Sequence, residues 1–228
     1  MEDYLQNGWF FREESALIDQ FILSNTNWSY PPLVPEIRLR LANEALAIWE
    51  KTEAQLEQEG LAPPFWAFAW CGGQALARFI LDNPSLFIGK RCLDLACGSG
   101  LIAIAASKVG SKHVLAADID LFAVESARLN ALGNEVSIDV VKHDFLTGPI
   151  PEIDILFIGD LFYEASLAQN VLVWAKRALK QGVMVFVGDP GRSYFPQKEF
   201  VSICSYEVPV SLEIEDTTQK PTTVWRLA

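Results

Sequence analysis

Asp94-Leu95-Ala96-Cys97-Gly98-Ser99-Gly100 is the stretch that decides the fold of this 228-residue chain. A short run from Arg91 to Leu93 leads into it, and a segment of mostly Ala, Ile and Leu follows from Leu101 to Val109. A strand, a glycine turn and a small-residue helix, in that order, form the first βα unit of a nucleotide-binding sheet. Gly98 and Gly100 allow the backbone to approach a ligand closely because no Cβ intervenes. The free N–H groups at the start of the helix would then face a carboxylate or a phosphate.

The rest of the chain continues as alternating strands and helices. Further strands are predicted at 113–117, 136–141, 153–158, 183–187, 206–212 and 223–227. Helices are predicted at 121–132 and 164–179, the latter with its inward face formed by Leu167, Val171, Trp174, Ala175 and Ala178. Alternation of this kind is typical of a mostly parallel sheet that binds ligands at its carboxyl edge. The sequence therefore predicts an α/β fold with a seven-stranded, Rossmann-like sheet.

The N-terminal part of the chain has a different pattern. Apolar residues at helical spacing predict helices at 13–24 and 36–59, and Pro31, Pro32 and Pro35 indicate an extended connector between them. We expect these helices to form a cap beside the sheet. The predicted division is a helical segment over residues 1–62 and a sheet domain over residues 63–228.

Composition excludes several classes of function. The formal net charge of −11 argues against nonspecific nucleic-acid binding, which needs many Lys and Arg side chains. An acidic surface fits a basic or lysine-bearing partner, although it also simply favours solubility. Four cysteines without CxxC spacing and two histidines predict no metal site. The acidic N-terminus does not resemble a signal peptide and no apolar run is long enough to span a membrane, so we expect a cytoplasmic protein.

An aspartate follows each of five predicted strands. Each one alone can be explained as a turn residue or a helix cap. Five at one edge of a sheet favour ligand binding, since carboxylates accept from ribose hydroxyls or from an amine. The five are Asp94, Asp118, Asp144, Asp160 and Asp189.

An unusual aromatic segment, PPFWAFAWCGG, occupies residues 63–73. It can be a buried strand or turn that fills the core, because Trp and Phe are commonly buried. It can also be a rigid aromatic wall over a ligand, with Gly72 and Gly73 making room. A helix is predicted to follow from Gln74 to Leu81.

The glycine spacing distinguishes between two cofactors. A dinucleotide fingerprint has a third glycine for helix packing, and position 103 is alanine here. A carboxylate at Asp94 would repel a pyrophosphate, whereas the ammonium group of an amino acid suits that place. Asp118 follows Asp94 by 118 − 94 = 24 positions, which is right for a βαβ step that ends on a ribose-binding acid. S-adenosylmethionine (SAM) is therefore favoured over a nicotinamide cofactor.

Six blocks of sequence resemble the lysine methyltransferases that act on the electron-transfer flavoprotein β subunit, a family of seven-strand lysine methyltransferases. The resemblance covers roughly residues 30–228 and excludes residues 1–30. The blocks are PEIRL (35–39), PFWAFAWCGGQALARF (64–79), DLACGSG (94–100), GDLFYE (159–164), GDPGR (188–192) and TTVWRL (222–227).

The resemblance implies SAM-dependent methylation of lysine side chains on that flavoprotein subunit. It implies catalytic roles for Asp160 and Tyr163, which match the acid-x-x-aromatic motif, although Tyr163 can also be ordinary packing at a helix start. Relatives carry glycine at position 96, so Ala96 is expected to fit only with a negative φ. The implied cofactor-binding residues are Trp70, Asp94, Ala96, Gly98, Gly100, Asp118, Ile119, Asp144, Phe145 and Gly159.

Two questions stay open at the level of the sequence. Asp189 and Arg192 follow the fifth strand, where they can bind the target protein or merely cap a turn. The alternative functions are methylation of a small-molecule amine, methylation of another protein such as a ribosomal protein, and SAM binding without catalysis. The last of these would not require both Asp160 and Tyr163.

Overall fold

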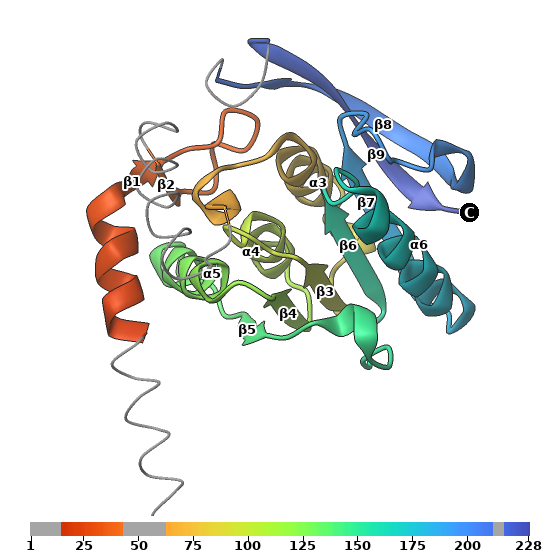
Figure 1. Cartoon of the computed structure of the whole chain (residues 1–228), viewed down its shortest axis with the longest axis horizontal. Helices are drawn as coiled ribbons and strands as arrows, with labels where there is room; N and C mark the ends of the chain where they lie inside the picture. Colours follow the sequence, from red (N-terminus) through yellow and green to blue (C-terminus); the bar gives the residue numbers. More distant parts are fainter. Residues whose placement is uncertain (1–14, 43–62, 212–216) are drawn as a thin grey trace, which may run out of the picture.

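A seven-stranded sheet runs through the centre of the computed structural model, which describes residues 15–42, 63–211 and 217–228 (Figure 1). The strand order is β5-β4-β3-β6-β7-β9-β8. Five strands pair in parallel: β3 (Arg91–Leu95), β4 (His113–Asp118), β5 (Asp139–Lys142), β6 (Ile155–Gly159) and β7 (Met184–Asp189). The antiparallel pair β8 (Phe200–Pro209) and β9 (Gln219–Leu227) completes the sheet beside β7. The predicted α/β fold with seven strands is confirmed.

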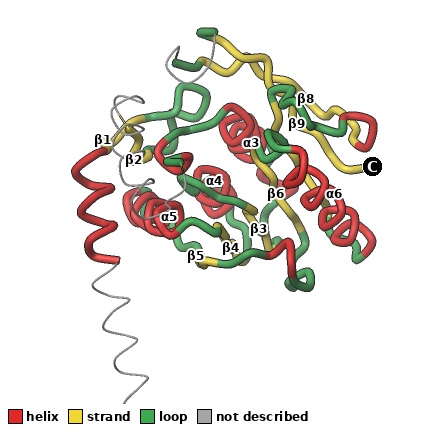
Figure 2. Tube along the Cα trace, viewed as in Figure 1, coloured by secondary structure: helices red, strands yellow, loops and turns green. Residues whose placement is uncertain are grey.

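Helices cover both faces of the sheet, with α3, α4 and α5 on one face and α6 on the other (Figures 1 and 2). Their bounds are α3 (Cys71–Asp82), α4 (Leu101–Lys108), α5 (Leu121–Gly133) and α6 (Ala165–Lys180). Side chains of a strand alternate between the two faces. In β6, Ile155 and Phe157 belong to the core under α3 and α4, whereas Leu156 and Ile158 belong to the core under α6. Burial on both faces explains why β6 is almost wholly apolar.

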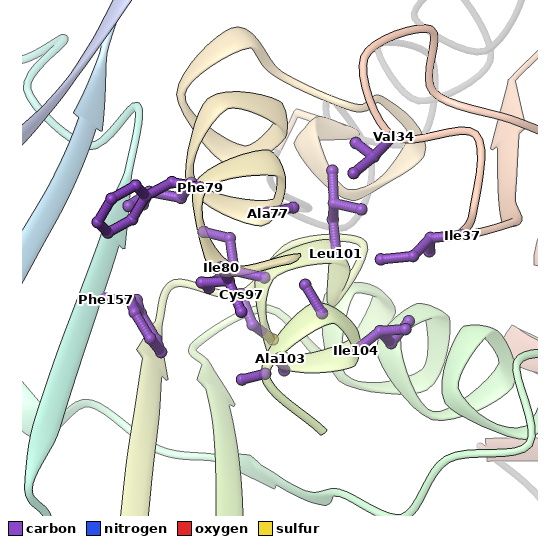
Figure 3. Packing of buried hydrophobic residues seen from close by; sticks show 14 of the residues in the cluster. Val34, Ile37, Ala77, Phe79, Ile80, Cys97, Leu101, Ala103, Ile104 and Phe157 are labelled. Carbon is purple, nitrogen blue, oxygen red and sulfur yellow. The ribbon is translucent and has the colours of Figure 1, made fainter. Parts of the chain in front are cut away.

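The core under α3 and α4 combines large rings with small helix residues (Figure 3). Phe79 of α3 lies 5.6 Å from Phe186 of β7 between ring centres, and Phe186 lies 6.3 Å from Phe157 of β6. Ala103 of α4 is fully buried in the same cluster. Small side chains let α4 pack closely on the sheet, which fixes the place where its N-terminus meets the glycine turn.

The strand order creates a crevice at one edge of the sheet. The chain runs outward from β3 through β4 to β5 and then returns to β6, which pairs with the other side of β3. The crossovers after β3 and β6 therefore leave in opposite directions. In open α/β sheets a ligand binds outside the carboxyl ends of the strands at such a switch point.

The N-terminal part departs from the prediction. Residues 15–25 form a helix, as expected for that stretch, but the predicted helix over 36–59 is wrong at its start. Residues Leu39–Ala42 form β2, which pairs antiparallel with β1 (Thr26–Ser29). The remainder of that predicted helix, from residue 43 to 59, lies outside the described residues. The division of the chain at residue 62 stays a prediction.

Alternating arginines explain the strand at 39–42. The guanidinium carbons of Arg38 and Arg40 lie 4.9 and 4.8 Å from the ring centre of Trp28. Residues two apart share a face only in an extended chain, so this pair of cation–π contacts favours a strand over a helix. Arg38 also donates from Nε and Nη2 to the Gly133 carbonyl, which ties the small sheet to the end of α5.

Other elements differ from the prediction mainly in their bounds. The third predicted strand, at 136–141, is confined to Asp139–Lys142, and α3 begins three residues before the predicted Gln74. The strand predicted at 206–212 is instead Phe200–Pro209, because its partner β9 starts at Gln219 and pairs along its whole length. The aromatic segment 63–73 is neither strand nor simple turn, since residues Phe65–Ala67 form a 3₁₀ turn. None of the helices in the described ranges has the length and apolar character needed to span a bilayer.

The docking of α3 on the sheet gives a matched pair of glycine variants. A Cβ added to Gly72 would lie 2.1 Å from the Gly188 carbonyl oxygen, whereas one added to Gly73 would meet no heavy atom within 4 Å. We expect Gly72→Ala to lower the free energy of unfolding by about 1–3 kcal/mol through overpacking. Gly73→Ala should leave it unchanged or raise it by up to about 1 kcal/mol, since alanine favours a helix. Urea unfolding tests both, and equal midpoints for the two variants would contradict this account of the α3 contact.

Candidate active site

A cavity of about 860 Å³ opens at the carboxyl edge of the sheet. Its wall includes the residues that follow four parallel strands: Ala96 and Gly98 after β3, Asp118 and Ile119 after β4, Asp144 and Phe145 after β5, and Asp160 and Tyr163 after β6. The Pro63–Trp70 segment forms the facing wall, with Phe65, Trp66 and Trp70 in the lining. The cavity therefore lies at the switch point of the strand order.

The turn after β3 presents its backbone to the cavity. Gly98 has φ +51, and a Cβ there would face open space with only the Trp66 Cα nearby, at 3.9 Å. Gly100 serves a different purpose, because a Cβ there would lie 2.9 Å from the Ala127 Cβ of α5. Gly98 lines the cavity and Gly100 does not. The first glycine keeps the cavity open, and the second lets two helices approach each other.

Ala96 departs from the expectation of a negative φ. Its φ is +55, in the left-handed region that favours glycine. The prediction of a negative φ was wrong, since the turn after β3 holds Ala96 in the left-handed conformation. An L-residue in this region costs roughly 1–2 kcal/mol, so the turn stores strain at the cavity wall.

Asp94 lies behind the cavity wall. Its side chain is fully buried, and Oδ2 accepts a hydrogen bond of 3.0 Å from the Ala103 N–H in the first turn of α4. The other oxygen, Oδ1, has no hydrogen-bond partner within the described part of the chain. Burial raises the pKa of Asp94 to about 8. The carboxyl thus holds the first turn of α4 in place from behind the cavity wall.

Asp118, at the end of β4, is bonded to the turn that follows β3. Its Oδ2 accepts from the Gly98 N–H at 3.0 Å and its Oδ1 accepts from the Asp120 N–H at 3.0 Å. Burial raises the pKa of Asp118. Ile119, beside it, is 68% exposed, which leaves an apolar surface next to a carboxylate. This pairing of an acid and an apolar side chain suits a ribose with its attached base.

The loop after β5 supplies the far end of the cavity. Asp144 Oδ1 accepts from the Leu146 N–H at 3.0 Å and caps the short 3₁₀ turn Phe145–Thr147. The Phe145 ring lies 4.5 Å from His143 and 6.4 Å from Trp174 of α6, measured between ring centres. Phe145 therefore offers an aromatic surface whose position is set by contacts on two sides.

Asp160 is the most constrained acid of the cavity. It is 9% exposed and, like Ala96, has a positive φ of +55. Its Oδ1 accepts from Arg192 Nη2 at 2.8 Å and Nε at 3.3 Å, and its Oδ2 accepts from the Gly73 N–H at 3.1 Å. Burial raises the pKa of Asp160, and the Arg192 charge opposes that shift. Strained backbone and a shifted pKa in one buried residue are features of a functional site.

Aromatic side chains surround the mouth of the cavity beside Asp160. The Tyr163 ring lies 5.7 Å from Phe65, and Phe65 lies 5.9 Å from Trp70. Trp70 Nε1 donates to the Phe65 carbonyl at 2.8 Å, which fixes the indole. Tyr163 is 47% exposed, so its ring is available to a partner. Both interpretations of the aromatic segment apply: Trp66 and Phe68 fill the core, and Phe65 and Trp70 face the cavity.

The structure brings together most of the residues predicted from the sequence and adds others. Of the predicted set, all but Asp94 and Gly100 line the cavity. Sequence reasoning missed Phe65, the Arg192 side chain that pairs with Asp160, and the α6 side chains Gln169, Asn170 and Arg177. The GDPGR block carried a usable signal for Arg192 because it follows β7. Asp189 in the same block caps the turn, with Oδ1 accepting from the N–H groups of Gly191 and Arg192.

The cavity fits SAM on its own chemistry. Gly98 offers an open backbone, and Asp118 offers a carboxylate beside the apolar Ile119. In the described ranges the arginines of the cavity are Arg177 and Arg192, so these ranges place no phosphate-binding cluster of Lys or Arg at the turn after β3. Within those same ranges, no group of three or more His, Cys, Asp or Glu is placed to hold a metal ion.

Comparisons with known proteins agree with this chemistry. The family profile of ribosomal protein L11 methyltransferase (PrmA) matches residues 79–157. The fold resembles that of a ribosomal protein L11 methylase from Lactobacillus delbrueckii subsp. bulgaricus (TM-score 0.50, 21% identity, 69% of this chain and 79% of that one). It also resembles the magnesium protoporphyrin IX methyltransferase of Synechocystis PCC 6803, solved with bound SAM (TM-score 0.51, 13% identity, 68% and 79%).

The fold and the site thus define a SAM-dependent methyltransferase. The electron transfer flavoprotein beta subunit lysine methyltransferase of Xenopus laevis is 38% identical to this chain over 211 residues, with 90% of this chain and 85% of that protein covered. The chain belongs to the electron transfer flavoprotein beta subunit lysine methyltransferase family.

The strained turn at position 96 yields a stability prediction. Ala96→Gly should raise the free energy of unfolding by up to about 1 kcal/mol, because relief of a left-handed alanine outweighs the larger entropy of glycine in the unfolded chain. Ala105→Gly, the same chemical change inside α4, should lower it by about 0.5–1 kcal/mol or more. Chemical denaturation of both variants measures the difference. Destabilisation of similar size at both positions would show that the turn is not strained.

The buried Asp94 yields a pH prediction for the protein without cofactor. Burial raises the pKa from 3.8 to about 8, so the folded state retains a proton that the unfolded state loses. The contribution of Asp94 to stability is full below about pH 3.8 and is lost as the pH rises through about 8. Asp94→Asn should therefore flatten the fall in unfolding free energy between about pH 4 and 8, the interval between the two pKa values. Denaturant titrations across that range test this, and parallel curves for the two proteins would contradict the buried neutral acid.

Proposed function

We propose that this protein transfers methyl groups from SAM to lysine side chains of the electron-transfer flavoprotein β subunit. The observation that carries the proposal is the placement of a buried carboxylate, Asp160, between the glycine turn and an exposed aromatic rim of Phe65 and Tyr163. The relative from Xenopus laevis carries that substrate in its name, and 85% of its length is covered by this chain.

We assign the cofactor to one part of the cavity. When bound, SAM supplies an electrophilic methyl group on a positively charged sulfur. Gly98 and Asp118 would hold its polar and ribose groups, and Ile119, Asp144 and Phe145 would bind the base. Asp94 and Gly100 act indirectly, because they shape the turn from behind. The full proposed set is Trp70, Asp94, Ala96, Gly98, Gly100, Asp118, Ile119, Asp144, Phe145 and Gly159.

The remaining part of the cavity handles the lysine. A lysine with a pKa of about 10.4 needs roughly 4 kcal/mol to become a neutral amine near pH 7.4. Burial between Trp70 and Tyr163 lowers the pKa of such an amine, whereas the Asp160 carboxylate raises it. The main task of Asp160 is therefore to orient the lysine nitrogen by a hydrogen bond. Proton release to water can occur at the half-exposed side of Tyr163. Tyr163 also packs on the aliphatic stem of the lysine, where a cation–π contact contributes about 0.5–2 kcal/mol.

The alternative functions, methylation of a ribosomal protein and methylation of a small-molecule amine, receive less support. The L11 methyltransferase profile matches only residues 79–157, which cover the cofactor half and not Asp160 or Tyr163. A small-molecule amine would need a cover over the cavity mouth, and Tyr163 there is 47% exposed. Within the described residues the mouth is open beside an aromatic rim, which suits a side chain presented by a folded protein.

The setting of the protein is also part of the proposal. Its four cysteines are thiols in the described structure, in keeping with a reducing compartment such as the cytoplasm. The net charge of −11 favours a lysine-bearing protein over a nucleic acid as substrate. We also retain the division into an N-terminal segment, residues 1–62, and a methyltransferase domain, residues 63–228.

A first variant tests the cofactor half. Asp118→Ala should weaken SAM binding by about 1.5–3 kcal/mol, the value of hydrogen bonds to a charged group. Isothermal titration calorimetry with SAM measures this, and circular dichroism checks that the fold is retained. Unchanged affinity in a folded variant would remove Asp118 from the ribose site.

A second variant tests the transfer itself. Asp160→Asn retains the shape of the side chain but removes the charge that orients the amine, so turnover on purified electron-transfer flavoprotein should fall by about 10²-fold or more. SAM affinity should change little, in contrast to Asp118→Ala. The assay is methyl transfer from labelled SAM, with melting temperature measured in parallel. Normal turnover together with a lower melting temperature would mean that Asp160 only stabilises the start of α3 and the turn that carries Arg192.

A further inference from the structure

The acceptor sites of Asp160 are already filled. Oδ1 receives two N–H groups of Arg192, at 2.8 and 3.3 Å, and Oδ2 receives the Gly73 amide at 3.1 Å. A hydrogen bond from the Gly72 amide also lowers the pKa of this carboxyl. A carboxylate has about four lone-pair sites. An incoming amine can therefore bind Asp160 only where one of the present donors leaves.

The backbone donors cannot leave. Gly72 and Gly73 belong to the first turn of α3, and Gly72 is packed so tightly on Gly188 that even a Cβ would not fit between them. Arg192 differs because it is a long side chain in the turn after β7, where Gly191 has φ +89. Its release from Asp160 requires rotation of side-chain bonds and no movement of the sheet.

In the position where it pairs with Asp160, the Arg192 guanidinium also contacts an aromatic ring. Its Cζ lies 5.6 Å from the centre of the Trp70 ring, and both residues line the cavity. A cation over an indole face keeps part of its stabilisation when an ion pair is lost. The Arg192 side chain is 19% exposed, so it lies between the buried carboxylate and the cavity mouth.

We propose that Arg192 is a substrate-mimicking positioning residue: in the free protein its guanidinium occupies the place on Asp160 Oδ1 that the ammonium group of the target lysine takes, and the lysine displaces it. This inference rests on the lysine methylation proposed above. Arg192 and lysine share the features that the place selects, namely a positive charge, several N–H donors and a long aliphatic stem.

The exchange explains two properties of the site. Arg192 keeps a buried carboxylate ionised and correctly aimed before the substrate arrives, when an unpaired charge would be costly. It also sets a threshold for substrates, because an amine must outcompete a guanidinium that is already bound. A lysine on a protein gains additional contacts with the rim formed by Phe65 and Tyr163, whereas a small free amine gains few. Arg192 thereby favours protein substrates.

Kinetics of Arg192→Gln test the exchange through a quantity that a purely structural role would not change. Loss of the adjacent cation should raise the pKa of Asp160, so the acidic limb of the kcat/KM profile should shift upward by about one pH unit or more. Above that limb, KM for the flavoprotein substrate should fall several-fold because the competitor is gone. Arg226→Gln, which removes one charge from an exposed position on β9, should leave the pH of the acidic limb of the kcat/KM profile unchanged. An unshifted limb, or a KM that rises at every pH, would overturn the proposal.

A binding measurement separates this proposal from the proposed function. In protein labelled with ¹⁵N-arginine, the Arg192 Nε–H signal is assigned by its loss in Arg192→Gln. Titration of wild-type protein at constant pH with n-butylamine in large molar excess, which offsets the rim contacts that a small amine lacks, should shift that signal, and n-butanol at the same excess should not. A signal that n-butylamine leaves unmoved would overturn the exchange. A signal that moves in a protein that methylates no flavoprotein would support the cation exchange and reject the proposed function.

Discussion

The N-terminus of α3 reaches the carboxyl ends of β6 and β7 with no side chain between them, because Gly72 and Gly188 are in direct backbone contact. This contact aims the first amides of α3 at Asp160, which accepts from Gly73. The positive end of a helix and a buried carboxylate stabilise each other. The same contact places Trp70, the residue before α3, at the cavity, so one backbone approach sets both the acid and the aromatic wall of the site.

Several features that lower the stability of the fold lie together at the carboxyl edge of the sheet. Ala96 and Asp160 both have positive φ, and burial raises the pKa of Asp94, Asp118, Asp120, Asp160 and Asp189. Apolar cores on both faces of the sheet supply the stability that holds these residues in place. Such local conflict within a well-packed fold is typical of a site that is organised before its ligands bind.

Sequence patterns predicted what depends on local order. The apolar strand at β3 and the glycine turn gave the fold class, and the acids after the strands gave most of the cavity wall. The pattern did not predict β2, because its strand depends on pairing with β1 and on arginines that stack on Trp28 of that strand. It also misjudged the backbone of Ala96, and it left the role of Arg192 open, since an ion pair with Asp160 joins residues 32 positions apart (192 − 160). Tertiary contacts of this kind leave no periodicity in a single sequence.

The claim that the cavity at the switch point is the SAM site is tested most directly by a crystal structure of this protein with S-adenosylhomocysteine, the product of methyl transfer from SAM. The account predicts ribose hydroxyls within hydrogen-bonding distance of Asp118, the base against Ile119 and Phe145, and the sulfur on the side of the cavity that faces Asp160. A ligand bound outside this cavity, or one whose sulfur lies far from Asp160, would contradict the account.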